Sequence, residues 1–344
     1  MRNSPGFWLL ISLASLPLAC TNSASNNPSA PTTVINIVNY PTPVPTWNPS
    51  IGKNWYQATA SAAVTSRYYH TNLVFNNLMW IIAGYASGPA TYKSDVWSSS
   101  DGVNWTAATA AATFAARGTH SSVVFNPATG SGLDGKMWVI GGTNGSTDYN
   151  DVWSSPDGVI WSAATTQAPF SVRENHTSLV YGGKMWVIGG NTGSTFFNDV
   201  WSSPDGVNWT RATANAAFSP RWGHTSVVYN NAMWVIGGAN ASAQYLNDVW
   251  YSTDGVNWTL ATGAAEFPKR ELSFSVVYNG AMWEIAGRNG SDLNDVWYST
   301  DGNIWTQATA AAAFSARNAH TSVVFNNHMW IFGGDAPNDV WYSP

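Results

Sequence analysis

Short apolar runs separated by polar turns fill the chain from Trp55 onward, and the same four runs return six times. They are of the types HTSVVY, MWVIGG, NDVWSS and NWTRAT, all rich in β-branched or aromatic residues. Asn-Asn, Gly-Gly and Asp-Gly pairs mark the boundaries of these runs, and such pairs are typical of tight turns. Each unit is therefore predicted to form a four-stranded antiparallel meander.

The spacing of the units predicts how they assemble. The tryptophans of the Met-Trp pairs follow one another at steps of 58, 48, 48, 49 and 47 residues, and they are Trp80, Trp138, Trp186, Trp234, Trp283 and Trp330. Four strands in about 48 residues, repeated many times, are typical of a β-propeller blade. We therefore expect an all-β chain that forms a six-bladed β-propeller of four-stranded antiparallel blades.

The two ends of the repeat region predict how the propeller closes. The chain stops within the third strand of its sixth unit, at residues 341–344, so this unit lacks its own fourth strand. Residues 54–59 (NWYQAT) have the sequence of a fourth strand with no unit before them. We expect this N-terminal strand to complete the last blade, which would remove a free sheet edge.

Several repeated motifs carry a resemblance to a known family. They are the R-x-x-H motif before five of the six first strands, the Met-Trp pairs, the later tryptophans and the di-glycines Gly141-Gly142, Gly189-Gly190, Gly237-Gly238 and Gly333-Gly334. With these motifs, residues 52–344 resemble the kelch-repeat β-propeller family, including its galactose-oxidase-type propellers. The resemblance implies the propeller fold and says little about activity. The Asp-Gly turns also resemble in part the Asp-boxes of sialidase propellers, although they lack one residue between Asp and Gly.

Composition narrows the classes of function. The 344 residues contain 14 Lys+Arg and 19 Asp+Glu, a net charge of −5, without a basic cluster that could meet phosphates. We therefore do not expect a nucleic-acid-binding protein. The single cysteine, Cys20, excludes an intramolecular disulfide and a cysteine-rich zinc site. We expect no metal ion and no cofactor.

The N-terminal residues predict export. Residues 1–20 have a basic start and an apolar run and end in LPLAC, so they are expected to be a signal peptide whose Cys20 lies in a lipobox-like motif. Lipidation is the favoured interpretation, while ordinary secretion and an uncleaved anchor stay open. Residues 21–50, rich in Asn, Ser, Pro and Thr, are expected to be a flexible tether before the propeller of residues 51–344. The expected location is the bacterial cell envelope, periplasmic or at the surface, or outside the cell.

Residues that recur in every unit are interpreted first as structural. Eighteen of the 21 tryptophans occupy three repeated positions, and we expect them to form the core between blades. The acids of the Asp-Val-Trp and Asp-Gly motifs are expected to hold turns by accepting backbone amides. Arginine and histidine of R-x-x-H would point to opposite faces of an extended strand, and we expect the histidine to pack between blades. The arginine has two open interpretations, a structural role and a cationic rim that attracts an anionic ligand.

Positions at which the units differ are the candidates for function, because the scaffold does not require them. The residue after each R-x-x-H arginine varies, and the segment that holds it is expected to share one mouth of the channel with the loop after the di-glycines. The candidate ligand-binding residues at this mouth are Tyr68, Glu174, Trp222, Glu271 and Asn318 together with Arg173, Arg221 and Arg270. Trp222 would stack on a sugar ring while Glu174 or Glu271 accepts hydroxyl hydrogen bonds. Ordinary drift on a solvated rim is the alternative.

The fifth unit differs most from the others. Ser273 stands where the other units have histidine, Glu284 occurs in MWEIAG where they have Val or Ile, and Arg288 replaces a residue of the glycine loop. These departures make the fifth blade a candidate part of the site.

An enzyme is the alternative to a binding module. Copper chemistry of the galactose oxidase type would imply a tyrosine–cysteine crosslink, and residues 51–344 contain no cysteine. A sialidase would need an arginine triad and a nucleophilic tyrosine, and nothing in the sequence marks a nucleophile. A sugar mutarotase needs only acid and base groups such as Glu174 and Glu271, so this alternative stays open.

We therefore expect a monomeric, extracytoplasmic interaction module with no catalytic activity. Its ligand would be a protein or a glycan bound at the pore mouth, and its contact with a membrane would be only through a lipid on Cys20. The alternative is a carbohydrate-active propeller enzyme such as a sugar mutarotase or a sialidase-like protein.

Overall fold

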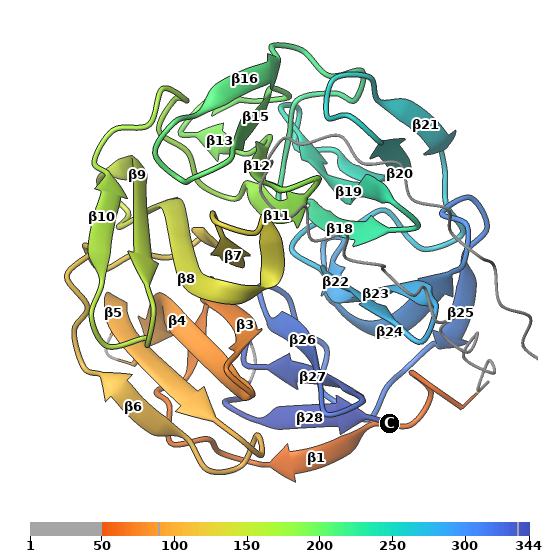
Figure 1. The fold of residues 1–344 in the computed structure, drawn as a ribbon. Coiled ribbons are helices and arrows are strands. Elements are labelled where there is room, and N and C mark those ends of the chain that lie inside the picture. Colours follow the sequence, from red (N-terminus) through yellow and green to blue (C-terminus); the bar gives the residue numbers. More distant parts are fainter. Residues whose placement is uncertain (1–49, 89, 336) are drawn as a thin grey trace, which may run out of the picture. The chain divides into compact units, whose positions relative to one another are not determined.

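The computed structural model describes residues 50–88, 90–335 and 337–344, and within them the strands form six blades around a central channel (Figure 1). The predicted signal peptide, Cys20 and all of the predicted tether except Ser50 lie outside the described residues. Among the described residues, no helix has the length and apolar character needed to cross a bilayer. The predicted six-bladed, all-β propeller is confirmed.

Each blade is a four-stranded antiparallel sheet whose first strand lines the channel and whose fourth strand forms the outer edge (Figure 1). The first blade consists of β3 (Thr71–Phe75), β4 (Leu78–Ser87), β5 (Ala90–Ser99) and β6 (Thr106–Thr109), and the second of β7 (Ser121–Asn126), β8 (Ser131–Thr143), β9 (Asp148–Ser155) and β10 (Ser162–Thr165). The third blade consists of β11 (Thr177–Tyr181), β12 (Lys184–Ile188), β15 (Val200–Ser203) and β16 (Thr210–Thr213), and the fourth of β18 (Thr225–Tyr229), β19 (Ala232–Asn240), β20 (Tyr245–Ser252) and β21 (Thr259–Thr262). The fifth blade consists of β22 (Phe274–Tyr278), β23 (Ala281–Arg288), β24 (Asp292–Ser299) and β25 (Thr306–Thr309), and the sixth of β26 (Thr321–Phe325), β27 (His328–Phe332), β28 (Val340–Ser343) and β1 (Tyr56–Thr59). The two-residue strands are β2 (Arg67–Tyr68), β17 (Arg221–Trp222), β13 (Asn191–Thr192) and β14 (Thr195–Phe196).

The sixth blade combines the two ends of the propeller. Its outer strand β1 pairs antiparallel with β28, as the sequence predicts. In the third blade, the turn between the last two strands is held by a hydrogen bond from Gly206 N to Ser203 Oγ at 2.8 Å. The same bond in the sixth blade runs from Gly52 N to Ser343 Oγ at 3.0 Å. The N-terminal segment therefore completes both a strand and a turn of this blade.

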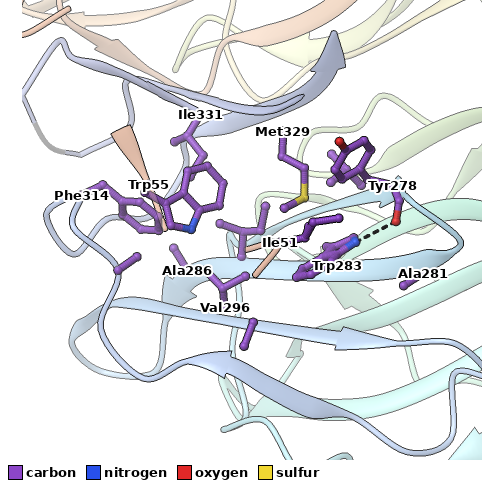
Figure 2. Packing of buried hydrophobic residues seen from close by; sticks show 14 residues of the cluster. Ile51, Trp55, Tyr278, Ala281, Trp283, Ala286, Val296, Phe314, Met329 and Ile331 are labelled. Atoms are coloured by element: carbon purple, nitrogen blue, oxygen red, sulfur yellow. Dashed lines mark hydrogen bonds between the residues drawn. The ribbon is translucent and has the colours of Figure 1, made fainter. Parts of the chain in front are cut away.

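Large aromatic side chains fill the space between neighbouring blades. Figure 2 shows one such cluster, in which Ile51 and Trp55 from the N-terminal segment pack with Trp283 of β23 and Ile331 of β27. Trp55 meets Phe314 edge-on, with ring centroids 5.1 Å apart. The same tryptophan–phenylalanine contact recurs in other blades. The predicted core of repeated tryptophans is confirmed.

The Asp-Gly turns hold their own shape and make room for a tryptophan of the neighbouring blade. Asp205 Oδ1 accepts the backbone N–H groups of Val207 and Asn208 at 2.9 and 2.7 Å, as predicted for these acids. Gly206 has a φ of 78°, and a Cβ built on it would lie 2.2 Å from Trp138 Cζ3. Only glycine fits this position, because it tolerates the left-handed conformation and has no Cβ.

Candidate ligand-binding site at the channel mouth

A closed ring of backbone hydrogen bonds surrounds one end of the channel. The residue before the histidine position of each blade donates its N–H to the carbonyl of its counterpart in the preceding blade, at 2.8 to 3.2 Å. We call these residues the collar, and they are Tyr69, Thr119, Asn175, Gly223, Leu272 and Ala319. Each has a left-handed φ of 50° to 59°. The chain therefore turns sharply here and does not continue as the extended strand assumed for R-x-x-H.

The arginine of each R-x-x-H motif is buried inside its blade. Arg173 binds both carboxylate oxygens of Asp199 at 2.8 and 3.0 Å and donates to the Gly189 carbonyl at 2.8 Å. Arg173, Arg221 and Arg270 are each 0% exposed and each pairs with the aspartate of the next Asp-Val-Trp motif. Of the two interpretations left open for the arginines, the cationic rim is therefore wrong, because these guanidinium groups face carboxylates inside the blade. The structural interpretation of the arginines holds.

The aspartates of the Asp-Val-Trp motifs bind arginine, whereas the sequence predicts that they hold turns. Besides Arg173, Asp199 accepts the indole N–H of Trp201 at 2.7 Å. The guanidinium carbon of Arg173 also lies 5.4 Å from the ring centroid of Phe170 and 4.5 Å from that of Phe197. An arginine–aspartate pair of this kind is present in all six blades. The repeated charges therefore join the start of each blade to its third strand.

The histidines line the channel beneath the collar and contact the preceding blade. His176 Nε2 lies 2.8 Å from Ser121 Oγ, and His70, His120 and His224 make the equivalent contact with a threonine hydroxyl. Burial lowers the pKa of His176 to about 3, so its ring is neutral. The predicted packing of histidines between blades is confirmed. The collar, the histidines and the hydroxyl residues that follow them line a cavity of about 180 Å³.

The variable residues after the arginines lie next to the collar on the side of the channel mouth. The backbone of each pairs with the second strand of its own blade or with the segment after that strand. The candidate residues gathered here, which we call the mouth ring, are Tyr68, Glu174, Trp222, Glu271 and Asn318. The structure thus places five of the eight candidate residues around one opening and the three arginines inside the blades.

Glu174 is held against the collar. Its Oε2 accepts the hydroxyl hydrogen of Thr119 at 3.1 Å, and its Oε1 accepts the Asn191 amide at 3.4 Å. Burial raises the pKa of Glu174, the nearby Asp148 acts in the same direction, and the two hydrogen bonds oppose the shift. Glu174 is therefore a fixed acceptor beside the opening, with part of its hydrogen-bonding capacity already used.

Glu271 is buried at the mouth with little compensation. Its side chain is 7% exposed, and its Oε2 has no hydrogen-bond partner among the described residues. Burial raises the pKa of Glu271 to about 7, while the charge of Arg288 opposes the shift. Arg288 is the backbone partner of Glu271, and its guanidinium lies 3.9 Å from Asp292. Within the described part of the chain, no ion pair includes Glu271.

The other polar and aromatic members of the mouth ring differ in how freely they can bind. Trp222 is half-buried and precedes Gly223, a collar position without a side chain. Asn318 is 4% exposed and donates its amide hydrogen to Asp292 Oδ1 at 2.8 Å. Trp222 therefore offers part of its indole to a ligand, whereas Asn318 is engaged by a neighbouring segment.

Four tyrosines form a continuous aromatic patch at the first blade, which we call the tyrosine patch. The ring centroid of Tyr68 lies 4.8 Å from that of Tyr69 and 5.3 Å from that of Tyr85, and Tyr85 lies 4.8 Å from Tyr92. A Cβ on Gly118 would lie 3.2 Å from the Tyr92 ring, so the small residue of the second blade gives this ring room. The sequence analysis identified only Tyr68. Tyr85 and Tyr92 were the available signal, but they belong to a segment whose sequence differs from unit to unit.

The fifth blade replaces the histidine contact with a buried carboxyl group. Glu284 is 0% exposed, and its Oε2 accepts Ser275 Oγ at 2.5 Å and Thr225 Oγ1 at 3.4 Å. Thr225 holds the position that binds histidine elsewhere, and Ser273 takes the place of that histidine. Glu284 Oε1 has no partner, and burial raises the pKa of this carboxyl to about 7. The two unusual residues of this blade therefore compensate for each other in part.

The mouth provides groups for binding by charge, hydrogen bonds and stacking. Carboxylates, an indole and phenol rings lie around one opening, and aromatic faces of this kind bind apolar groups and cations. In the described ranges, no three His, Cys, Asp or Glu side chains are grouped so that they could hold a metal ion. The residues with perturbed pKa at the mouth are Glu174, Glu271 and members of the tyrosine patch.

One comparison with known families identifies the repeats. The family model described as the KLHDC2/KLHL20/DRC7 Kelch-repeats domain matches residues 160–334. This segment begins before β10 of the second blade and ends after β27 of the sixth, so it includes Glu174, Trp222 and Glu271. A search of curated proteins gives no match to the chain.

Proposed function

The chain belongs to the kelch-repeat family, and on this premise we propose that its propeller is a non-catalytic binding module whose ligand docks on the mouth ring. Kelch domains generally mediate protein interactions. The observation that carries the proposal is a contrast within the repeats. The arginine–aspartate pairs recur in all six blades, whereas the residue of the mouth ring changes from blade to blade. Variation that the scaffold does not need is expected where a ligand is recognised.

The experiment that tests this proposal compares the purified chain with its Trp222→Ala variant. Both are screened against a displayed peptide library and a glycan array, and the affinity of each selected ligand is measured. Loss of the indole should weaken binding about tenfold or more, while the unfolding free energy changes by less than about 1 kcal/mol, because Trp222 lies outside the core. The control is Ile160→Ala, an exposed residue of an Asp-Gly turn. Equal affinities of wild type and Trp222→Ala would contradict the proposed site.

A glycan is the second candidate ligand. The observation in its favour is the half-buried indole of Trp222 in the same ring as the acceptor groups of Glu174 and Glu271. Tryptophan stacks on the apolar face of a sugar while carboxylates accept its hydroxyl groups. Hits on the glycan array without hits in the peptide library would favour this candidate.

A carbohydrate-active enzyme remains the alternative class. Glu271, with a pKa raised to about 7, has the property expected of a general acid or base, as a sugar mutarotase would require. A sialidase-like activity is less well supported, because Arg173, Arg221 and Arg270 are all engaged by aspartates. Turnover of a sugar by wild type that is lost in Glu271→Gln would favour the enzyme. The absence of turnover across a sugar panel would count against it.

We also propose that the module is exported and held at the cell envelope by a lipid on Cys20. The support is the LPLAC motif after an apolar run in the first twenty residues. Cys20→Ala should abolish labelling with a fatty-acid probe and release the protein from the membrane fraction. Labelling that persists in this variant would contradict the proposal.

A further inference from the structure

The mouth brings carboxyl groups and aromatic rings together, while Arg173, Arg221 and Arg270 are buried with aspartate partners and Arg288 is its exposed arginine. Glu174 and Glu271 belong to the mouth ring, and Asp148 is close enough to Glu174 to raise its pKa. The hydroxyl of Thr192 donates to Asp148 Oδ2 at 2.5 Å, so this carboxylate also has a fixed position. Carboxyl groups of the second, third and fifth blades thus lie near one end of the channel.

The position of Glu271 points to a missing positive charge. A carboxylate withdrawn from water is stable only when hydrogen bonds or a cation replace its hydration. Glu271 is 7% exposed with Oε2 unpartnered, and the guanidinium of Arg288 lies close to Asp292. Arg288 offsets the burial of Glu271 only in part, so a cation that enters the mouth would supply the rest of the counter-charge.

Both glutamates lie against residues of the collar. Glu174 binds Thr119 of the collar, and the Cβ of Glu271 lies 3.5 Å from the place of a Cβ on collar residue Gly223. Burial raises the pKa of Tyr69, a third collar residue, to about 12, and both glutamates add to the shift. The negative potential of the third and fifth blades therefore extends across the collar to the first blade.

The tyrosine patch supplies the second element of a cation site. The faces of aromatic rings attract ammonium and guanidinium groups, most strongly where water is partly excluded. Tyr68 and Tyr69 lie in the same mouth as the glutamates. The charge of Glu174 also contributes to the raised pKa of Tyr92. Carboxylates and aromatic faces around one opening match the charge and the shape of a lysine or arginine side chain.

We propose that the ligand of the mouth ring is a basic protein segment, and that a lysine or arginine side chain of this segment binds between Glu174, Glu271 and the tyrosine patch. This inference rests on the proposed function and specifies its ligand. A neutral glycan would leave Glu271 without a counter-charge, and an acidic peptide would be repelled by the carboxylates. The exposed Lys269 lies two residues before Glu271 in the chain and would attract an acidic ligand. Its single positive charge is outnumbered by the carboxylates of Asp148, Glu174 and Glu271.

The test measures binding of three fluorescein-labelled pools of random twelve-residue peptides to the full chain. One pool is enriched in Lys and Arg, one in Asp and Glu, and one in Ser and Asn. The variants are Glu271→Gln and Glu174→Gln, which keep side-chain size and remove one charge each. The matched control is Glu266→Gln, because Glu266 is exposed outside the mouth ring and accepts Trp305 N at 2.8 Å, a role that a glutamine oxygen retains.

We expect the basic pool to bind, to weaken about tenfold in Glu271→Gln and to be unchanged in Glu266→Gln. Binding should also weaken with added salt, because the attraction is electrostatic. Preferential binding of the acidic or neutral pool, lost in Trp222→Ala, would overturn the basic ligand and leave the proposed function standing. Basic-pool binding that is equal in all three glutamine variants would overturn the inference as well. No binding of any pool or glycan would count against the proposed function itself.

Discussion

Replacing Glu284 by glutamine should remove a pH dependence of stability that arises in the fifth blade. Glu284 is fully buried, its Oε1 lacks a partner, and its pKa is raised from 4.5 to about 7, chiefly by burial. Glutamine has nearly the same shape and can accept from Ser275, but it carries no ionisable proton. The comparison therefore isolates the cost of the charge.

The size of this pH dependence follows from the difference between the pKa of Glu284 in the folded state and its pKa in the unfolded state. Below pH 4.5 both states hold the proton of Glu284, and the charge cost is absent. Between pH 4.5 and 7 the unfolded chain releases the proton first, so the free energy of unfolding falls as the pH rises. Above pH 7 the loss is complete, and 2.5 pKa units correspond to about 3 kcal/mol.

The assay is urea unfolding followed by tryptophan fluorescence at pH values from 4.5 to 8. We expect the unfolding free energy of Glu284→Gln minus that of wild type to rise by about 3 kcal/mol across this range. Contributions of the glutamates at the mouth cancel in the difference, since both proteins contain them. A flat difference for Glu284→Gln would refute the reasoning.

Two further predictions concern the repeated scaffold. Arg173→Met should lower the unfolding free energy in urea by about 3 kcal/mol, because it leaves the largely buried Asp199 without a cation. The double variant Arg173→Met/Asp199→Leu should recover part of the loss, and a loss below about 1 kcal/mol would argue against the pair. Gly206→Ala should cost at least about 2 kcal/mol more than Gly193→Ala, because both glycines have positive φ but only Gly206 is 2.2 Å from Trp138 at its would-be Cβ. Equal melting temperatures of the two alanine variants would contradict this account.

The fold could be predicted because every blade repeats the same local sequence motifs. Turn pairs separate β-rich runs six times, and residues 54–59 match the fourth strand of the other units. This match alone predicted the pairing of β1 with β28. The contribution of Gly52 was missed, although its Gly-x-Asn-Trp context equals that of the Asp-Gly turns, because the aspartate is replaced by Ile51.

The arginine–aspartate pairs could not be assigned from the sequence. Arg173 and Asp199 are 26 residues apart, and several acids lie at comparable distances along the chain. The six arginines at the blade starts match the six Asp-Val-Trp aspartates in number, but with an extended R-x-x-H segment both a structural arginine and a cationic rim stayed open. The left-handed turn at the collar means that the R-x-x-H segment is not extended. The sequence does not predict this turn, because residues such as Tyr69 and Leu272 seldom adopt a positive φ.

The candidate site was predicted only where it depends on the alignment of the repeats. Comparison of equivalent positions brings Glu174, Trp222 and Glu271 to one mouth without knowledge of any contact. The tyrosine patch depends instead on the register of β4 with β5, which pairs Tyr85 with Tyr92 in the strand ends before and after the turn. The buried role of Glu284 depends on contacts between blades, which no single repeat reveals.

Photocrosslinking tests most directly whether ligands dock on the mouth ring. A benzoylphenylalanine residue is placed at Tyr68 in one protein and at Val207, an exposed residue of an Asp-Gly turn at the other end of the blades, in a second. Each protein is irradiated with the same ligand, selected from the peptide library with wild type. The account predicts an adduct from position 68 and none from position 207. An adduct from position 207 alone would contradict it.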